Sequence, residues 1–442
     1  MQVTPLLLSL VVSLATAAPT ALVGATVHPV SGPPIPDGVV LFDGPTLTAV
    51  GPRGAVEIPS DATVRALPGR HIIPGLIDLH SHIGGGRLHE SLGPVQGGIS
   101  AIDAIDPTHI SIQRAQAGGV TLAQVMPGSG KLLGGQTALL RLTDASVVDD
   151  MLLCSEPPEG ATGPLRRVAV CGGVKMAGGT NPQGSGSDPR SRMGATFLQR
   201  EALLAARDRR DAQDRRAAAL ASPRRRDRQH APPAPDPDPA ADGLVEILRG
   251  ERTVHFHSHR ADDIVGAVRL QQELGFGLVI HHGSEGFKVA DLLAEADIPV
   301  AINVLDTPGG KEETLERRFD NPAILHAAGV RVAIITDDPV QDSRLLLRSA
   351  GLAARGGLPL DVALRALTRT PAELLAVEDR KGSLEPGLDA DLVVLSGPPL
   401  SSWTLVEETW VEGARVFDRA DPRDRAHATG GDAALAPPPD VP

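Results

Sequence analysis

The sequence predicts an α/β protein in which a (β/α)₈ barrel stands beside a small β domain built from both ends of the chain. Three observations predict this fold. Apolar strands alternate with amphipathic helices through the middle of the chain, and short Val-rich and Leu-rich fragments occur near both ends. The length of 442 residues accommodates a barrel of about 250 residues and one further domain.

Residues 18–73 are predicted to form the first part of the β domain. They contain short apolar stretches separated by Gly and Pro, such as GVVLFDG at 38–44, which are typical of strands and hairpins. Residues 381–420 return to this style with DLVVL at 391–395. Two similar β fragments that flank an α/β segment predict one small domain assembled from both.

Residues 74–380 carry the barrel pattern. A helix that begins near Asp262 and Asp263 has apolar residues at helical spacing and stops at Gly275, and further strands and helices alternate after it. This order predicts a parallel sheet with crossover helices. The expected strands after Gly275 are 278–280, 299–304 and 332–335. Residues 201–242 are an insertion, with a solvated Ala-, Arg- and Asp-rich helix followed by a stiff proline-rich linker.

The two ends of the chain predict processing and disorder. Residues 1–17 combine an apolar run with an Ala15-Thr16-Ala17 cleavage site, so we expect a signal peptide and export to the periplasm or the medium. No later run approaches the ~20 apolar residues that span a bilayer, which predicts no membrane insertion of the mature chain. Residues 421–442 are polar and proline-rich, and a disordered tail is expected. After export, Cys154 and Cys171 could pair, or they could remain two buried thiols.

Composition narrows the classes of function. The net charge of −12 argues against a nucleic-acid partner or an anionic membrane surface. The absence of Tyr and the presence of only 7 Phe and 2 Trp weaken a single-stranded nucleic-acid or carbohydrate function. Two cysteines cannot form a four-cysteine zinc site. A small-molecule substrate is expected, and any metal must be held by histidines and carboxylates. A homo-oligomer stays open.

Half of the 14 histidines fall in three clusters at the ends of apolar strands. A single histidine in a strand is more often a hydrogen-bonded core residue than a ligand, but three clusters at one end of a predicted barrel favour a catalytic metal centre. His80 and His82 project to the same face of their strand, and Asp337 ends another strand. The remaining members are His255, His257, His259, His281 and His282.

At these residues the sequence resembles the metal-dependent amidohydrolase superfamily, in its imidazolonepropionase-like and prolidase-like branch. The resemblance covers nearly all of the mature chain, and its first and last motifs are together highly specific. Its motifs are PGLIDLHSH at 74–82, GGVT at 118–121, PGS at 127–129, GGQ at 134–136, HSHRADDI at 257–264, HG at 282–283, TDDP at 336–339, GSLEPG at 382–387 and ADLVV at 390–394. The resemblance implies a TIM-like barrel beside a β-sandwich built from both chain ends.

The resemblance also implies a site. It places His80, His82, His257 and His282 as metal ligands and Asp337 as both ligand and acid/base, with His255 and His259 as alternatives to His257. Lys175 resembles the strand lysine that members with two metals carboxylate, although TNPQ at 180–183 departs from close relatives. The alternative for Lys175 is a lysine that binds an anionic substrate or faces solvent.

The implied chemistry is hydrolysis of an amide or cyclic amide C–N bond. One or two divalent ions, with Zn²⁺ first and Mn²⁺ or Fe²⁺ as alternatives, would activate water, and Asp337 would move its proton to the leaving nitrogen. His281 is expected at the opposite face of its strand from His282, and His281 or His259 could stabilise the tetrahedral intermediate. Arg192 and Arg260 are candidates for a substrate carboxylate.

Three rival functions stay open at this stage. The first is a prolidase-like dipeptidase, which requires a pocket for a free carboxylate. The second is a deaminase with one metal, favoured if Lys175 lies far from the histidines. The third is a barrel that binds a metal or a ligand without catalysis.

Overall fold

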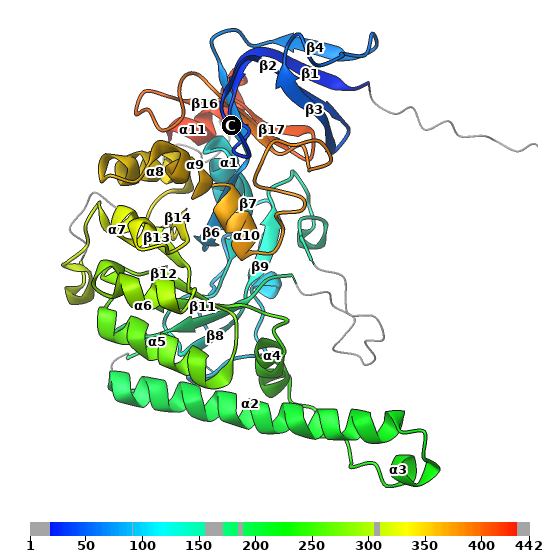
Figure 1. The fold of residues 1–442 in the computed structure, drawn as a ribbon, viewed down its shortest axis with the longest axis vertical. Helices are drawn as coiled ribbons and strands as arrows, with labels where there is room; N and C mark the ends of the chain where they lie inside the picture. The colour runs from blue at the N-terminus through cyan, green and yellow to red at the C-terminus, as the bar shows by residue number, and fades with distance from the viewer. Residues whose placement is uncertain (1–17, 91, 155–170, 184–188, 305–309, 431–442) are drawn as a thin grey trace, which may run out of the picture.

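The computed structural model describes residues 18–430 with the exception of 91, 155–170, 184–188 and 305–309. The predicted signal peptide at 1–17 and the tail beyond residue 430 lie outside the described residues. A β domain occupies the upper end of the molecule, and an α/β body lies below it (Figure 1).

Eight strands from both ends of the chain form the sheet of the β domain. Their order is β17-β16-β15-β5-β1-β2-β3, with β4 paired to β1. The bounds are β1 (Thr20–Val27), β2 (Ile35–Asp43), β3 (Thr46–Pro52), β4 (Thr63–Ala66), β5 (His71–Pro74), β15 (Leu392–Leu395), β16 (Val406–Val411) and β17 (Ala414–Asp418). The predicted assembly of one β unit from both chain ends is therefore observed in the hydrogen bonding.

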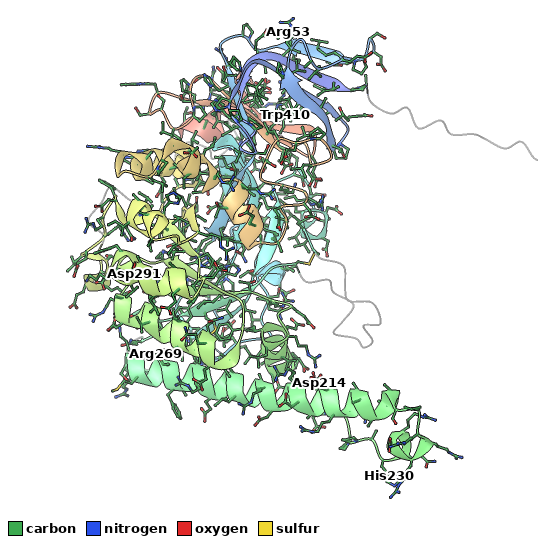
Figure 2. All side chains as sticks on the ribbon, in the orientation of Figure 1. Arg53, Asp214, His230, Arg269, Asp291 and Trp410 are labelled. Atoms are coloured by element: carbon green, nitrogen blue, oxygen red, sulfur yellow. A yellow bond between two sulfur atoms is a disulfide. The ribbon has the colours of Figure 1, made fainter. Side chains whose placement is uncertain are left out.

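This sheet curls over its own apolar core. Three strands separate β2 from β16, so a flat sheet would hold them about 19 Å apart at the usual strand spacing. The rings of Phe42 on β2 and Trp410 on β16 nevertheless lie 5.5 Å apart, and both belong to one buried cluster with Leu22 and Leu392. The expected two-sheet sandwich is thus a single sheet folded around its core, with Trp410 labelled in Figure 2.

The α/β body contains two hydrogen-bonded sheets. One has the order β14-β13-β12-β11-β10-β8 and the other the order β6-β7-β9. All neighbouring pairs are parallel except those of β8 and β9. The bounds are β6 (Leu76–Ser81), β7 (Val120–Val125), β8 (Leu133–Gln136), β9 (Ala138–Arg141), β10 (Val174–Ala177), β11 (Val254–Ser258), β12 (Leu278–His282), β13 (Val300–Asn303) and β14 (Val332–Ile335).

The two sheets meet at two seams. β8 and β9 are separated by Thr137 alone, so one extended segment pairs with β10 at its start and with β7 at its end. At the other seam, β6 and the residues after β14 join through one isolated bridge between Ser81 and Asp338. The hydrogen-bond ladders are not continuous around the ring, and a closed barrel is not formed by them. The expected (β/α)₈ barrel appears as two mixed sheets joined at these seams.

Helices connect the parallel strands. Their bounds are α1 (Ile110–Ala117), α2 (Arg192–Ala221), α3 (Arg225–Gln229), α4 (Pro239–Leu248), α5 (Ala261–Leu274), α6 (Ala290–Glu295), α7 (Asn321–Ala327), α8 (Leu346–Arg355), α9 (Leu360–Arg365), α10 (Arg369–Leu374) and α11 (Pro422–Thr429). Helix α5 ends where the sequence predicts, because Gly275 adopts φ 72°, a left-handed conformation that ends helices at low cost. Asp262 and Asp263 lie in its first turn, next to the positive end of the helix dipole.

The inserted segment between β10 and β11 forms an arm at the bottom of the molecule. Helix α2 runs beyond the body, and α3 lies at its far end (Figure 1); Asp214 on α2 and His230 at the tip are labelled in Figure 2. Arg209 on α2 pairs with Asp242 on α4 at 2.7 Å. The predicted solvated helix and proline-rich segment are both present, and α4 follows the prolines with Asp238 as its cap.

The prediction of disorder from residue 421 is wrong for residues 422–429. These residues form α11, because Asp421 caps its first turn and Pro422 starts the helix. Arg344 donates hydrogen bonds to the carbonyls of His427 and Gly430, and α11 packs against α1. A favourable cap and a docking surface therefore order a segment that composition alone marks as disordered.

Two further expectations concern the pairing of the two cysteines and insertion into a membrane. Cys154 and Cys171 form a disulfide, so the paired alternative is the one observed. No helix in the described part of the chain combines the length and the apolar composition that crossing a bilayer requires.

Candidate metal centre

The seam between β6 and β14 brings the first candidate ligands together. The backbone N–H of Asp337 donates to the carbonyl of His80 at 2.9 Å, and that of His82 donates to the carbonyl of Asp338 at 3.0 Å. Below them, the buried Asp78 carboxylate accepts from the backbone N–H groups of His80 and Thr336. Burial raises the pKa of Asp78 to about 7. This lattice of hydrogen bonds fixes the backbone that carries the ligands.

His80 and His82 both approach the carboxylate of Asp337. Oδ1 of Asp337 lies 3.3 Å from Nε2 of His80 and 3.1 Å from Nε2 of His82. Ligand atoms at about 2.0–2.1 Å from a tetrahedral Zn²⁺ are about 3.3 Å apart, so each of these two separations matches one edge of a zinc coordination shell. The other ring nitrogen of His82 lies 2.7 Å from the carbonyl oxygen of Met126, which orients Nε2 toward Asp337.

His282 belongs to two groups of side chains that could each hold an ion. The first group is His80, His282 and Asp337, and the second is His257, His259 and His282; in each group the ligand atoms lie within 4.8 Å of one another. Nε2 of His282 is buried and has no hydrogen-bond partner among the described residues. Because an unpaired buried nitrogen is costly, this atom is evidence that the cluster fits a cation.

The second group adds His259 to the predicted ligands. Its Nδ1 lies 2.9 Å from the hydroxyl of Ser284, which leaves Nε2 for a ligand. The rings of His257 and His282 are 4.4 Å apart, and Nε2 of His257 lies 3.2 Å from the side-chain amide nitrogen of Asn181. The sequence motif at 257–264 left His259 as an alternative to His257, whereas the fold brings both rings to the same cluster.

Lys175 on β10 lies inside this constellation. Its side chain is fully buried, and Nζ is 2.9 Å from Nε2 of His80 and 3.2 Å from Sδ of Met126. Burial lowers the pKa of Lys175 to about 7, against an opposing effect of the Asp337 charge. A substantial neutral fraction is the consequence, and the neutral amine is the form that can react with CO₂.

Burial keeps the histidine rings neutral. It lowers the pKa of His80, His257 and His282 well below 6.5 and that of His259 to about 3, and the positive charge of Lys175 contributes to each of these shifts. Neutral imidazole is the metal-binding form of histidine. Four neutral rings and one carboxylate are therefore a donor set for divalent zinc, manganese or iron.

His281 does not occupy the predicted position. Strand alternation predicts opposite faces for His281 and His282, but His282 adopts φ 71°, which ends the extended geometry and turns both rings inward. The ring of His80 lies 4.9 Å from each of them. His281 is absent from the residues that line the cavity described below. His80, a candidate ligand, is absent from that lining as well, so the catalytic role of His281 stays a prediction.

A cavity of about 520 Å³ opens in front of the metal-ligand cluster. Asp337 is the single carboxylate among the described residues that line it, whereas Lys311 and Arg317 contribute two cations. Nε and Nη1 of Arg317 are buried without a hydrogen-bond partner in the described part of the chain, and burial lowers the pKa of this guanidinium. Lys311 donates to Oδ1 of Asn181 at 2.6 Å.

Arg192 and Arg260 are not brought to this cavity. Arg192 pairs with Asp263 at 2.8 Å and with Glu313 at 3.4 Å, and Arg260 pairs with Asp262 at 3.0 Å. Both arginines therefore pair with acidic residues in the first turn of α5. Sequence reasoning missed Arg317, because it lies in no motif. A basic residue in the loop after a barrel strand is weak evidence of substrate binding by itself. The position of Arg317 in the lining of the cavity makes it a candidate.

The chain is similar to known amidohydrolases. The model of the amidohydrolase family matches residues 292–416. A solved amidohydrolase of Thermotoga maritima is 32% identical, with 90% of this chain and 100% of that chain covered and a TM-score of 0.78. Imidazolonepropionase of Paracoccus denitrificans is 26% identical over 399 residues, which are 81% of this chain and 88% of that protein.

The chain is also similar to a prolidase of the same fold and to part of a longer amidohydrolase. A prolidase solved with N-methylphosphonate-L-proline shares the fold, at 20% identity and a TM-score of 0.55 over 90% of this chain and 99% of that chain. The chain spans 39% of the length of the amidohydrolase tasK of Hapsidospora irregularis, to which it is 26% identical over 405 residues, 85% of this chain. The chain therefore belongs to the amidohydrolase superfamily, resembles imidazolonepropionase, and is a hydrolase of the amidohydrolase type, a class that acts on carbon–nitrogen bonds.

Proposed function

We propose that the protein hydrolyses an amide or cyclic amide C–N bond of a small molecule that carries a carboxylate. The observation that carries the proposal is that Asp337, which lines a 520 Å³ cavity, lies 3.3 Å from Nε2 of His80 and 3.1 Å from Nε2 of His82. A divalent ion held by these side chains would supply a Lewis acid to polarise a carbonyl oxygen and acidify water. We regard the two sheets of the body as a TIM-like barrel, whose strand ends build such sites.

Asp337 is the proposed acid/base. It lines the cavity, takes a proton from the attacking water as oxygen bonds to the carbonyl carbon, and returns it to the nitrogen as the C–N bond breaks. The products are a carboxylic acid and an amine. Oδ1 of Asp337 lies 3.3 Å from Nε2 of His80 and 3.1 Å from Nε2 of His82, which are candidate ligands of the same site.

We propose one or two ions, with Zn²⁺ first and Mn²⁺ or Fe²⁺ as alternatives. The two histidine groups that share His282 support a second position, with His257 and His259 as further ligands. Lys175 is the proposed carboxylation site: its neutral Nζ bonds to the carbon of CO₂ and releases one proton. The resulting anion would lie beside His80 and favour cations there. A mononuclear deaminase is disfavoured, because Lys175 is 2.9 Å from His80.

The carboxylate of the substrate is the proposed partner of Arg317. A guanidinium with two unpaired buried N–H groups offers the charge-assisted hydrogen bonds that carboxylates accept, and Lys311 adds a second positive charge at the same cavity. N-acyl amino acids and Xaa-Pro dipeptides both meet this requirement. The dipeptidase alternative is therefore retained beside the amidase.

Localisation and domain limits are proposals of the same kind. We propose export, supported by the disulfide between Cys154 and Cys171, since such bonds persist in oxidising compartments. We propose domain limits at 18–73 with 381–420 for the β domain and 74–380 for the hydrolase body.

Elemental analysis followed by a hydrolysis screen tests the function. The protein is loaded with zinc or manganese and assayed on N-acyl amino acids, Xaa-Pro dipeptides and cyclic imides. We expect bound metal and release of an amine from at least one class. The D337N variant should keep most of the metal and lose turnover. Absence of both metal and activity after loading would favour a non-catalytic barrel, and a fully active D337N would refute the acid/base assignment.

A further inference from the structure

Three histidines form a chain through the interior of the body, behind the metal-ligand cluster. Nδ1 of His80 lies 3.0 Å from Nδ1 of His281, and Nε2 of His281 lies 2.8 Å from Nδ1 of His255. The three rings are at most 1% exposed. None of the three rings lines the cavity of the metal centre, and His80 is the one member of the chain that is a candidate ligand.

The protons in this chain can be arranged in two ways. A neutral imidazole carries one proton, on one of its two ring nitrogens. A contact between two imidazole nitrogens needs one donor and one acceptor. The tautomer of one ring therefore fixes the tautomers of the other two, and both hydrogen bonds in the chain run in the same donor-to-acceptor direction.

Only one of these directions leaves His80 able to bind a metal. When His80 donates from Nδ1 to His281, the lone pair of its Nε2 faces Lys175 and Asp337. His281 then donates from Nε2 to His255, and His255 carries its proton on its outer nitrogen. In the reverse direction, Nε2 of His80 carries a proton and cannot be a ligand.

The outer end of the chain favours the productive direction. His255 lines a second cavity, of about 420 Å³, whose lining includes the carboxylates of Glu251 and Asp379 and lacks the metal ligands. Arg380 also lines this cavity, and its guanidinium pairs with Asp389 and Glu412. This polar space accommodates an outward N–H. The ring of His255 fits there because residue 173 is Gly: a Cβ at that position would lie 2.7 Å from Nε2 of His255.

We propose that His281 and His255 are positioning residues that fix the tautomer of His80 so that its Nε2 is presented to the metal. This inference rests on the metal centre of the proposed function. It assigns a role to two clustered histidines that the reaction itself does not use. Partners of this kind tune ligand orientation and basicity, and their removal typically weakens metal binding by about 10- to 100-fold.

Paired substitutions test the proposal. Leu at residue 281 removes the acceptor for His80, whereas Asn places its Oδ1 where Nδ1 of the imidazole was. We therefore expect H281L to weaken zinc binding by about 10- to 100-fold and H281N to stay within about threefold of the wild type. H255L and H255N should repeat the contrast more weakly. Zinc affinity is measured by competition with a chelator, and V279A, a buried change two residues earlier on β12, is the packing control.

Nitrogen chemical shifts of labelled histidine give a readout that does not depend on bound metal. In the metal-free wild type, His80 should carry its proton on Nδ1, and in H281L that preference should be lost. A proton on Nε2 of His80 in the wild type would overturn the inference, as would equal zinc affinities of H281L and H281N in folded proteins. If the wild type binds no metal, the proposed function fails, while the tautomer measurement still decides the inference.

Discussion

Replacing Arg317 by Met tests whether the substrate carries a carboxylate. The guanidinium has two buried N–H groups without a partner in the described residues, so a bound carboxylate would gain charge-assisted hydrogen bonds. Such bonds contribute about 1.5–3 kcal/mol net, which corresponds to about a 10- to 150-fold loss in kcat/KM when Arg317 is removed. Lys311 is exposed and bonded to Asn181, so K311M should cost about fivefold or less, as exposed ion pairs do.

The assay compares two substrates that differ at one group. An N-acyl amino acid and its carboxamide analogue are measured with the wild type and with R317M. The loss should occur with the acid and be largely absent with the carboxamide. R318M is the matched control, because Arg318 is next in the chain, is exposed and pairs with Asp320 at 2.5 Å. Equal losses on both substrates, or the same loss in R318M, would refute the reasoning.

The same substitution has a predicted effect on stability. Burial lowers the pKa of Arg317, which means that the folded protein disfavours the charge that it holds in the cavity. R317M should therefore unfold at a temperature no lower than that of the wild type. Loss of activity without loss of stability is typical of residues kept for binding.

Three further outcomes are expected. Replacing both Cys154 and Cys171 with Ser opens a loop with a sequence separation of 17 and should lower the free energy of unfolding by about 3 kcal/mol in the chain-entropy model; urea titration measures it, and an unchanged midpoint would contradict it. Burial, aided by the charge of His71, lowers the pKa of His28 to about 4. Because the unfolded state then binds more protons between about pH 4 and 6.5, stability should rise with pH in that window, and H28Q should flatten the rise; an equally steep profile in H28Q would exclude His28 as the cause. K175M should lower the metal content below that of the wild type, and full metal occupancy would argue against Lys175 as a ligand.

Local sequence patterns were sufficient for much of the fold. The helix ending at Gly275 and the strand at Val332–Ile335 occur where periodicity and a left-handed glycine predict them. The β domain follows from similar apolar fragments at the two chain ends. These features depend on interactions between residues that are close in sequence, or on burial patterns that a strand displays by itself.

Contacts between distant segments were not accessible in this way. The tail was expected to be disordered, but α11 docks through Arg344, more than 80 residues earlier. The approach of both His281 and His282 to His80 was not foreseen, because alternation along β12 could not reveal that His282 leaves the strand geometry with φ 71°. Arg192 and Arg317 were indistinguishable as basic residues until their partners were known.

The sequence by itself determined the chemistry that the protein carries. A shortage of Cys and Tyr, three histidine clusters at strand ends and the strand-end Asp337 limit the site to imidazole, carboxylate and lysine donors, since residue type and strand period are local properties. Only the tertiary structure decided which of these groups face one another. It joined β6 to β14, placed His259 with His257, placed His281 in the histidine chain and left two N–H groups of Arg317 without a partner among the described residues, because side-chain direction and burial depend on how strands from distant segments pack together.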